Sequence, residues 1–236
     1  MKPLILFDMD GTLIIQEKPP EYTGTKTHYG PYLSIKSQMK EIVIKHGVPS
    51  ELVMPLDRMA LIWNATRKYL DENHYSDTEI KAVMAEINEP FMVEERADHE
   101  ISVLIPDTIP GLEKLRDLGY EMGLVTTASR KSYDRISREK TYGCFGDYFK
   151  HSITRDECRY IKPDPEPIHR TLKLYNRDTF VYIGDTDHDA YACNAAGGRF
   201  VLLNTRRYDE DTVSLFSPYA VIEKLSELPD VLEKTV

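Results

Sequence analysis

The sequence predicts an α/β protein in which helices flank a parallel sheet and an all-helical insert interrupts the chain near its start. The apolar run Leu4–Leu6 reads as a buried strand and ends in an Asp-rich turn. Residues 16–98 then carry three helical patterns with no strand between them. Beyond them strands alternate with helices, which favours right-handed crossovers and a parallel sheet. We therefore expect a core domain formed by residues 1–15 and 99–236, with residues 16–98 as an inserted helical domain.

The first predicted strand delivers two carboxylates to the edge of the sheet. Asp8 and Asp10 are two residues apart, so on an extended chain their side chains leave on the same side. Two ionised carboxylates about 4 Å apart at an effective dielectric of about 20 repel by roughly 4 kcal/mol. A hard cation or a shared proton would relieve this. Gly11 permits a tight turn and Thr12 adds a hydroxyl, so an Asx turn with solvated carboxylates is the alternative.

Helical periodicity dominates the insert. The polar, Pro- and Gly-rich stretch from Ile14 to about Tyr32 predicts a long loop or a short hairpin, and within it Tyr22–His28 is placed to close over a substrate. Helices are expected over residues 34–46 and 56–71. Ser76–Glu79 forms a capping box that opens a third helix.

The rest of the chain alternates between the two element types. Amphipathic patterns with Gly stops indicate the helices, and short apolar runs indicate the strands. Helices are expected over residues 109–118, 130–138, 165–175, 190–196 and 223–232, with strands over residues 121–125, 148–153, 180–183, 200–203 and 219–221.

Polar residues follow several of these strands. Thr126 ends the strand at residues 121–125, and Asp185 ends the strand at residues 180–183. Ligands of open parallel sheets bind beyond the carboxyl ends of the strands, so these residues should share one edge with Asp8. Asp185–Asp189 holds three carboxylates, and carboxylate oxygens suit Mg²⁺ better than zinc. Lys162 supplies a cation that can balance a carboxylate and a phosphoryl oxygen.

Composition excludes several function classes. The 236 residues are 41% hydrophobic and 29% charged, which is ordinary for a globular protein. A formal net charge of -9 argues against nucleic acid as the main partner. Three cysteines without CxxC spacing indicate neither a zinc site nor a disulfide framework, and no stretch approaches a membrane span or a signal sequence. We expect a cytoplasmic protein with no membrane partner, whose oligomeric state, monomer or homodimer, stays open.

Four short motifs together resemble those of the haloacid dehalogenase-like hydrolase superfamily. Their order in the chain also matches, and the helical insert resembles the cap of phosphoglycolate phosphatase and β-phosphoglucomutase relatives. The resemblance covers nearly the whole chain and implies a Rossmann-like core. The motifs are Asp8-Met9-Asp10-Gly11-Thr12, Leu124-Val125-Thr126, Lys162-Pro163 and Gly184-Asp185-Thr186-Asp187-His188-Asp189.

The resemblance implies a Mg²⁺-dependent phosphatase for a small phosphorylated metabolite. Asp8 would be the nucleophile that forms an aspartyl-phosphate, and Asp10 the general acid and base. Asp8, the backbone carbonyl of Asp10 and Asp185 would hold Mg²⁺. Thr126 would bind the phosphoryl group, together with backbone N–H groups near Met9 and Thr127.

Two further residues take roles that the resemblance implies. Lys162 would balance the charge around Asp8. Asp189 would orient metal-bound water or Lys162, or would simply cap the helix at Ala190. Asp187 and His188 are expected to be solvated turn residues.

Other activities are possible on the same residues. A phosphomutase of the β-phosphoglucomutase type keeps all of them and returns the phosphoryl group to a sugar. A non-catalytic binding or regulatory module on this fold is the alternative from another class. A dehalogenase and a phosphonatase are disfavoured, because their resembling family members do not need an acid/base at the position of Asp10. The identity of the phosphomonoester is left open.

Overall fold

The computed structural model describes residues 2–17 and 29–233, whose contacts divide into two compact units. The sequence predicted boundaries between residues 15 and 16 and between residues 98 and 99. The structure places them close by, between residues 16 and 17 and between residues 101 and 102, and it adds residues 159–161 to the helical part. We call the two parts the core unit (Met1–Gln16, Ser102–Cys158 and Lys162–Val236) and the helical unit (Glu17–Ile101 and Arg159–Ile161).

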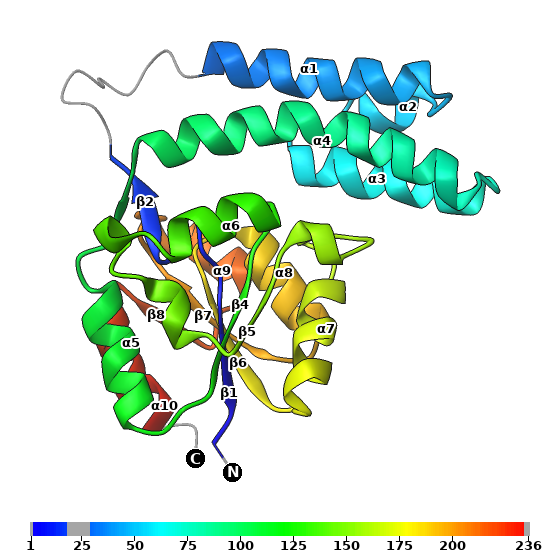
Figure 1. The fold of residues 1–236 in the computed structure, drawn as a ribbon. Helices are drawn as coiled ribbons and strands as arrows, with labels where there is room; N and C mark the ends of the chain where they lie inside the picture. The colour runs from blue at the N-terminus through cyan, green and yellow to red at the C-terminus, as the bar shows by residue number, and fades with distance from the viewer. Residues whose placement is uncertain (1, 18–28, 234–236) are drawn as a thin grey trace. The chain divides into compact units, whose positions relative to one another are not determined.

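The core unit is built on six parallel strands in the order β5-β4-β1-β6-β7-β8 (Figure 1). The first strand of the chain lies inside this sheet, between β4 and β6. This confirms the predicted parallel α/β architecture. The strands are β1 (Leu4–Phe7), β4 (Met122–Val125), β5 (His151–Ile153), β6 (Phe180–Gly184), β7 (Arg199–Leu203) and β8 (Ala220–Ile222).

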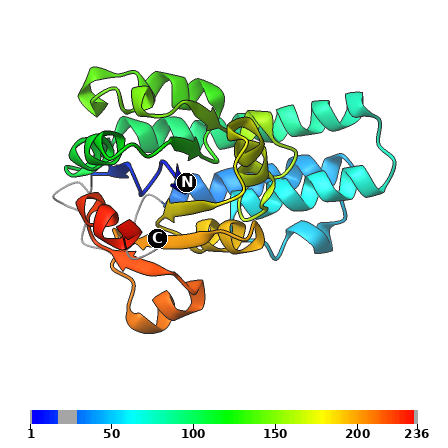
Figure 2. The ribbon, with the colours of Figure 1, turned by 90° about the horizontal axis from the view of Figure 1, so that it is seen from below.

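Helices cover both faces of the sheet, because alternate side chains of each strand enter different hydrophobic cores. In β1, Ile5 and Phe7 belong to one core, whereas Leu4 and Leu6 belong to the other. Helices α5, α6 and α10 complete the first core, and α7, α8 and α9 the second (Figures 1 and 2). These helices are α5 (Thr108–Asp117), α6 (Arg130–Ser137), α7 (Glu166–Tyr175), α8 (Asp187–Ala195), α9 (Glu210–Phe216) and α10 (Leu228–Glu233).

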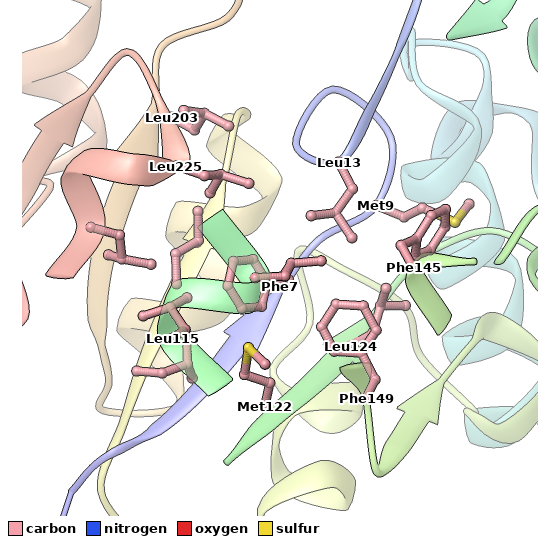
Figure 3. Close-up of a cluster of buried hydrophobic side chains, with 14 of the residues drawn as sticks. Phe7, Met9, Leu13, Leu115, Met122, Leu124, Phe145, Phe149, Leu203 and Leu225 are labelled. Carbon is pink, nitrogen blue, oxygen red and sulfur yellow. The ribbon is translucent and has the colours of Figure 1, made fainter. Parts of the chain in front are cut away.

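Aromatic packing shortens the strand that was predicted over residues 148–153. Figure 3 shows Phe149 in the core that contains Phe7, and the two ring centroids are 5.8 Å apart. Phe145–Tyr148 forms a 3-10 helix that brings Phe145 into the same core. Only His151–Ile153 then pairs with β4 as an edge strand.

The helical unit packs four helices around its own apolar core, which includes Met39, Trp63 and Ile87. Ser76 and Glu79 form the predicted capping box, in which each side chain accepts a hydrogen bond from the other residue's backbone N–H. The helices are α1 (Tyr29–Lys45), α2 (Ser50–Val53), α3 (Met59–Glu72) and α4 (Asp77–Glu100).

Helix α1 starts at Tyr29, within the stretch expected to be a loop. The segment Tyr22–His28, expected to close over a substrate, lies outside the described residues. Within the described ranges, no helix is long and apolar enough to cross a membrane.

A two-stranded antiparallel ribbon stands where the chain leaves and re-enters the core unit. It joins β2 (Ile14–Gln16) to β3 (Ser102–Leu104), with Ile14 opposite Leu104. The sequence predicted a long loop or a short hairpin from Ile14 but not this pairing with residues 102–104, because strands of three residues are too short to show alternation. The pairing holds together the segment by which the chain leaves the core unit and the segment by which it returns.

Candidate active site

Parallel pairing brings distant parts of the sequence to one edge of the sheet. Phe7 of β1 pairs with Leu124 of β4 and with Ile183 of β6. The residues that follow these strands therefore emerge side by side, and they include Asp8 and Asp185. The chain after β7 emerges at the same edge, because β7 pairs with β6.

Three carboxylates meet at this edge. Asp8, Asp185 and Asp189 are all buried, and one oxygen of each lies within 4.8 Å of the others. Asp189 lies in the first turn of α8, where its Oδ2 accepts hydrogen bonds from the backbone N–H of Thr186 at 3.0 Å and from its hydroxyl at 2.6 Å. These residues together could hold a metal ion, since hard divalent cations prefer oxygen ligands.

Lys162 joins two of these carboxylates. Its Nζ donates to Asp8 Oδ1 at 2.5 Å and to Asp189 Oδ1 at 2.6 Å, and the side chain is 4% exposed. A third bond runs to the hydroxyl of Tyr182 at 2.9 Å. All three hydrogen atoms of the ammonium group therefore have acceptors, and these hydrogen bonds offset the free-energy cost of burying the charge.

Tyr182 is a site residue that sequence analysis missed. Its hydroxyl accepts from Lys162 and donates to the backbone carbonyl of Val125 at 3.1 Å, so it joins Lys162 to the end of β4. A signal was present, because a buried tyrosine in an otherwise apolar strand needs a partner for its hydroxyl.

Arg206 is the second residue that was missed. Its Nε donates to Asp185 Oδ2, and the arginine side chain is half exposed. Arg206 follows β7 and so belongs to the same sheet edge, which the strand order alone could have indicated.

Two glycines make room for the carboxylates. Gly11 has a φ of +89°, and a Cβ there would lie 2.1 Å from Asp185 Oδ2. A Cβ on Gly184 would lie 2.5 Å from Cβ of Asp189. The turn after β1 can therefore approach the carboxylate of Asp185 only because it lacks a side chain there.

The remaining predicted residues surround the cluster. The hydroxyl of Thr12 is 3.5 Å from Asp185 Oδ1, and half-buried Asp10 forms a backbone bridge with Ile14. Thr126 is buried, and its hydroxyl accepts from the N–H of Ala128 at 3.0 Å.

The buried side chain of Arg155 forms a hydrogen bond to the turn after β4. It donates to the carbonyl of Thr127 at 2.8 Å. This contact fixes the backbone just beyond Thr126, where an anion-binding N–H was predicted.

Burial and neighbouring charges shift the pKa values of the three carboxyl groups in different directions. Desolvation raises the pKa of Asp8 well above its usual value, although Lys162 opposes the shift. Desolvation also raises the pKa of Asp185, to about 6, against the effect of Arg206. The ammonium of Lys162 lowers the pKa of Asp189 despite its burial. The pKa of Lys162 is lowered by desolvation but raised more by Asp189 and Asp8, which leaves it well above the usual value. The lysine is therefore a fixed cation.

The structure thus brings Asp8, Lys162, Asp185 and Asp189 into direct or near contact. Asp10 contributes no side-chain oxygen to the three-carboxylate group, but the prediction concerned its backbone carbonyl. Asp187 and His188 lie in the first turn of α8 rather than in the loop before it, because the capping box starts the helix at Asp187.

Comparison with known proteins decides the family. The model of the haloacid dehalogenase-like hydrolases matches residues 2–197. The chain belongs to this family. It is therefore a hydrolase, and the resemblance seen in its four motifs is confirmed.

Similar proteins cover the whole length of this haloacid dehalogenase-like hydrolase. A pyrophosphatase PpaX from Bacillus velezensis is 26% identical over 95% of this chain and 93% of its own. A phosphoglycolate phosphatase from Cereibacter sphaeroides is 27% identical over 98% of both chains.

Solved structures share the fold. A putative haloacid dehalogenase-like hydrolase from Bacteroides fragilis has a TM-score of 0.61, with 18% identity over 97% of this chain and 100% of its own. A putative phosphoglycolate phosphatase from Lactobacillus delbrueckii has a TM-score of 0.60, with 15% identity over 98% of this chain and 99% of its own.

Proposed function

We propose that this hydrolase cleaves a small phosphate monoester with the help of Mg²⁺, through an aspartyl-phosphate on Asp8. The observation that carries the proposal is the buried cluster of Asp8, Asp185 and Asp189 with Lys162. Three buried carboxylates exceed the two positive side chains, Lys162 and Arg206, that contact them, and a bound divalent cation would offset the remaining negative charge. The same cation can hold an anionic substrate. The names of the relatives, phosphatases and pyrophosphatases, agree with this chemistry.

The residues divide the reaction into two displacements. Asp8 attacks phosphorus, and Asp10 protonates the leaving ester oxygen as that bond breaks. Asp10 then removes a proton from water, which attacks the aspartyl-phosphate and frees both Asp8 and phosphate. Lys162 keeps Asp8 oriented through the 2.5 Å bond to its Oδ1, and Thr126 with the N–H of Thr127 binds the phosphoryl oxygens.

The donor set fits a magnesium ion. Asp8 and Asp185 offer carboxylate oxygens within 4.8 Å of each other, and the side-chain-free turn at Gly11 lets Asp185 approach. Asp8, the backbone carbonyl of Asp10 and Asp185 would hold the ion, with Asp189 orienting Lys162. When bound, Mg²⁺ neutralises phosphate charge so that an anionic nucleophile can approach.

The substrate class follows from this site and from the relatives. We propose a small phosphorylated metabolite rather than nucleic acid as partner, and the net charge of -9 agrees with that choice. Phosphoglycolate and pyrophosphate are the first compounds to test, because they give two of the relatives their names.

Phosphate release from p-nitrophenyl phosphate tests the proposal. Wild-type protein should release phosphate with Mg²⁺ and lose this activity in EDTA. Asp8→Asn should reduce kcat by about a thousandfold or more, because the nucleophile is gone. A phosphorylated peptide containing Asp8, recovered after acid quench, would identify the intermediate.

The control variant is Asp187→Asn, which changes a neighbouring carboxylate in the first turn of α8 outside the three-carboxylate group. It should retain most of the activity. A wild type as inert as Asp8→Asn on a panel of phosphorylated sugars, nucleotides and short acids would favour a binding module. Conversion of glucose 1-phosphate without release of phosphate would favour a phosphomutase.

A further inference from the structure

The turn after β7 places the guanidinium group of Arg206 beside Asp185, one of the proposed Mg²⁺ ligands. Thr205 donates its hydroxyl to the carbonyl of Gly11 at 2.7 Å, which fastens this turn to the turn after β1. Asn204 closes the turn by accepting from the N–H of Tyr208 at 2.8 Å and donating to its carbonyl at 3.2 Å. Arg206 lies between these anchors, and its Nε donates to Asp185 Oδ2.

Among the described residues, two cations contact the three-carboxylate group, and they are held very differently. Lys162 is 4% exposed and bonds to Asp8, Asp189 and Tyr182. The side chain of Arg206 is 50% exposed, and the contact with Asp185 joins an exposed group to a fully buried one. Removing Lys162 from its place would leave two buried carboxylates and its own buried ammonium group unpaired. Arg206 can move its charged end into water, and Asp185 alone then needs another cation.

The position of Arg206 disfavours a divalent ion at the same carboxylate. A guanidinium close to Asp185 both occupies Oδ2 and repels a second cation nearby. Lys162 occupies one oxygen of Asp8, Oδ1, and neither of its two carboxylate bonds involves Asp185.

We propose that Arg206 is an exchangeable counter-ion of the cation site: it neutralises Asp185 when no divalent ion is bound, and Mg²⁺ must displace it. The proposal rests on the proposed Mg²⁺ site. It gives Arg206 two opposite effects, since it stabilises the protein without metal and weakens metal binding. A residue that merely supports the fold would not separate these two properties.

Calorimetric titration with Mg²⁺ at pH 8 tests the proposal in the whole protein. Arg206→Gln should bind Mg²⁺ about tenfold more tightly than wild type, because a competing positive charge has been removed. The melting temperature of the same variant in EDTA should be lower than that of wild type. Arg206→Lys should lie closer to wild type in both measurements, because it keeps the charge.

Arg207→Gln is the matched control. Arg207 is the next residue in the turn and is exposed, so this variant should bind Mg²⁺ as wild type does. An Arg206→Gln affinity equal to or weaker than that of wild type overturns the inference, and leaves the proposed function intact if phosphate release still requires Mg²⁺. If neither wild type nor Arg206→Gln binds Mg²⁺, the inference and the Mg²⁺ site fail together. Binding by the variant alone would support displacement.

Discussion

At the scale of single residues, the site depends on how each buried charge is compensated. Lys162 has three acceptors, and one of them, the Tyr182 hydroxyl, also donates to the end of β4. Asp185 lacks a bond to Lys162 and instead has Arg206 and Thr12 close to its two oxygens. The ammonium group is therefore rigidly placed, whereas the carboxylate of Asp185 depends on a half-exposed guanidinium for its positive partner.

Tyr182→Phe should weaken this arrangement without abolishing it. The variant removes one acceptor of Lys162 and one donor to Val125, so we expect unfolding free energy to fall by about 1–3 kcal/mol. The kcat for phosphate release should fall severalfold, because we propose that Lys162 orients Asp8 through its hydrogen bond to Oδ1. Denaturant unfolding and steady-state kinetics measure the two effects. Tyr191→Phe, at a half-exposed tyrosine of α8, is the control and should change neither. Unchanged kinetics in Tyr182→Phe would show that Lys162 does not need its third partner.

The raised pKa of Asp185 predicts how stability without metal depends on pH. Its pKa of about 6 lies above the usual value of 3.8, so the folded protein binds this proton more tightly than the unfolded chain. This contribution to stability is fully present below about pH 4 and is lost as pH rises through about 6. In EDTA at pH 7.5, Asp185→Asn should therefore melt a few degrees above wild type, and the difference should shrink by pH 5. A wild type more stable than Asp185→Asn at pH 7.5 would contradict the direction of the shift.

At the scale of elements, the segment before Lys162 belongs to the helical unit. Asn64 of α3 donates to the carbonyl of Ile161 at 2.6 Å and accepts from its N–H at 2.9 Å. Asp71 of the same helix binds the side chains of Arg159 and Tyr160 at 3.1 and 2.9 Å. Helix α3 therefore holds the three residues that lead directly into Lys162.

Asn64→Ala should misplace Lys162 through the neighbouring backbone. We expect kcat to fall by about tenfold with little change in KM, because small displacements of a catalytic group are costly. The same substitution in a Lys162→Met background should cause no further loss, and this comparison separates positioning from general damage. Asn73→Ala removes an asparagine at the end of α3 whose side chain donates to the carbonyl of Tyr69 in that turn, and it should leave kcat unchanged. Equal losses from Asn64→Ala in both backgrounds would exclude the coupling.

At the scale of the whole molecule, two units with separate cores share one chain. The core unit supplies the carboxylates and Lys162, and the helical unit supplies the segment that precedes Lys162. Because the proposed metal ligands Asp8 and Asp185 directly follow β1 and β6, which are far apart in sequence, ion binding should be possible only in the folded state.

Mg²⁺ should therefore protect the protein against heat. A concentration a hundredfold above the dissociation constant stabilises by about 2.7 kcal/mol, which is about 5–10 °C in melting temperature at this chain length. Asp185→Asn should lose most of this protection, whereas NaCl of the same ionic strength should give none in either protein. Scanning calorimetry with and without the ion provides the measurement. Equal protection of wild type and Asp185→Asn would place the bound ion elsewhere.

Much of the core could be predicted from local patterns. The apolar runs of β1, β4 and β6 are fully buried, so they appear as continuous hydrophobic stretches that end in polar residues. The capping box at Ser76 and Glu79 is local in sequence and was found for that reason. The ribbon of β2 and β3 was missed, because strands of three residues are stabilised by pairing between distant segments rather than by their own pattern.

The sequence by itself determined the family, the parallel α/β architecture and the candidate carboxylates of the site. These depend on short motifs and on the order of strands and helices along the chain, which are local properties of the sequence. Only the tertiary structure decided the partners of each charge: Tyr182 for Lys162, Arg206 for Asp185, and Asn64 for the backbone before Lys162. The physical reason is that a hydrogen bond or ion pair requires contact within about 3 Å, and the residues that meet at that distance here come from separate elements.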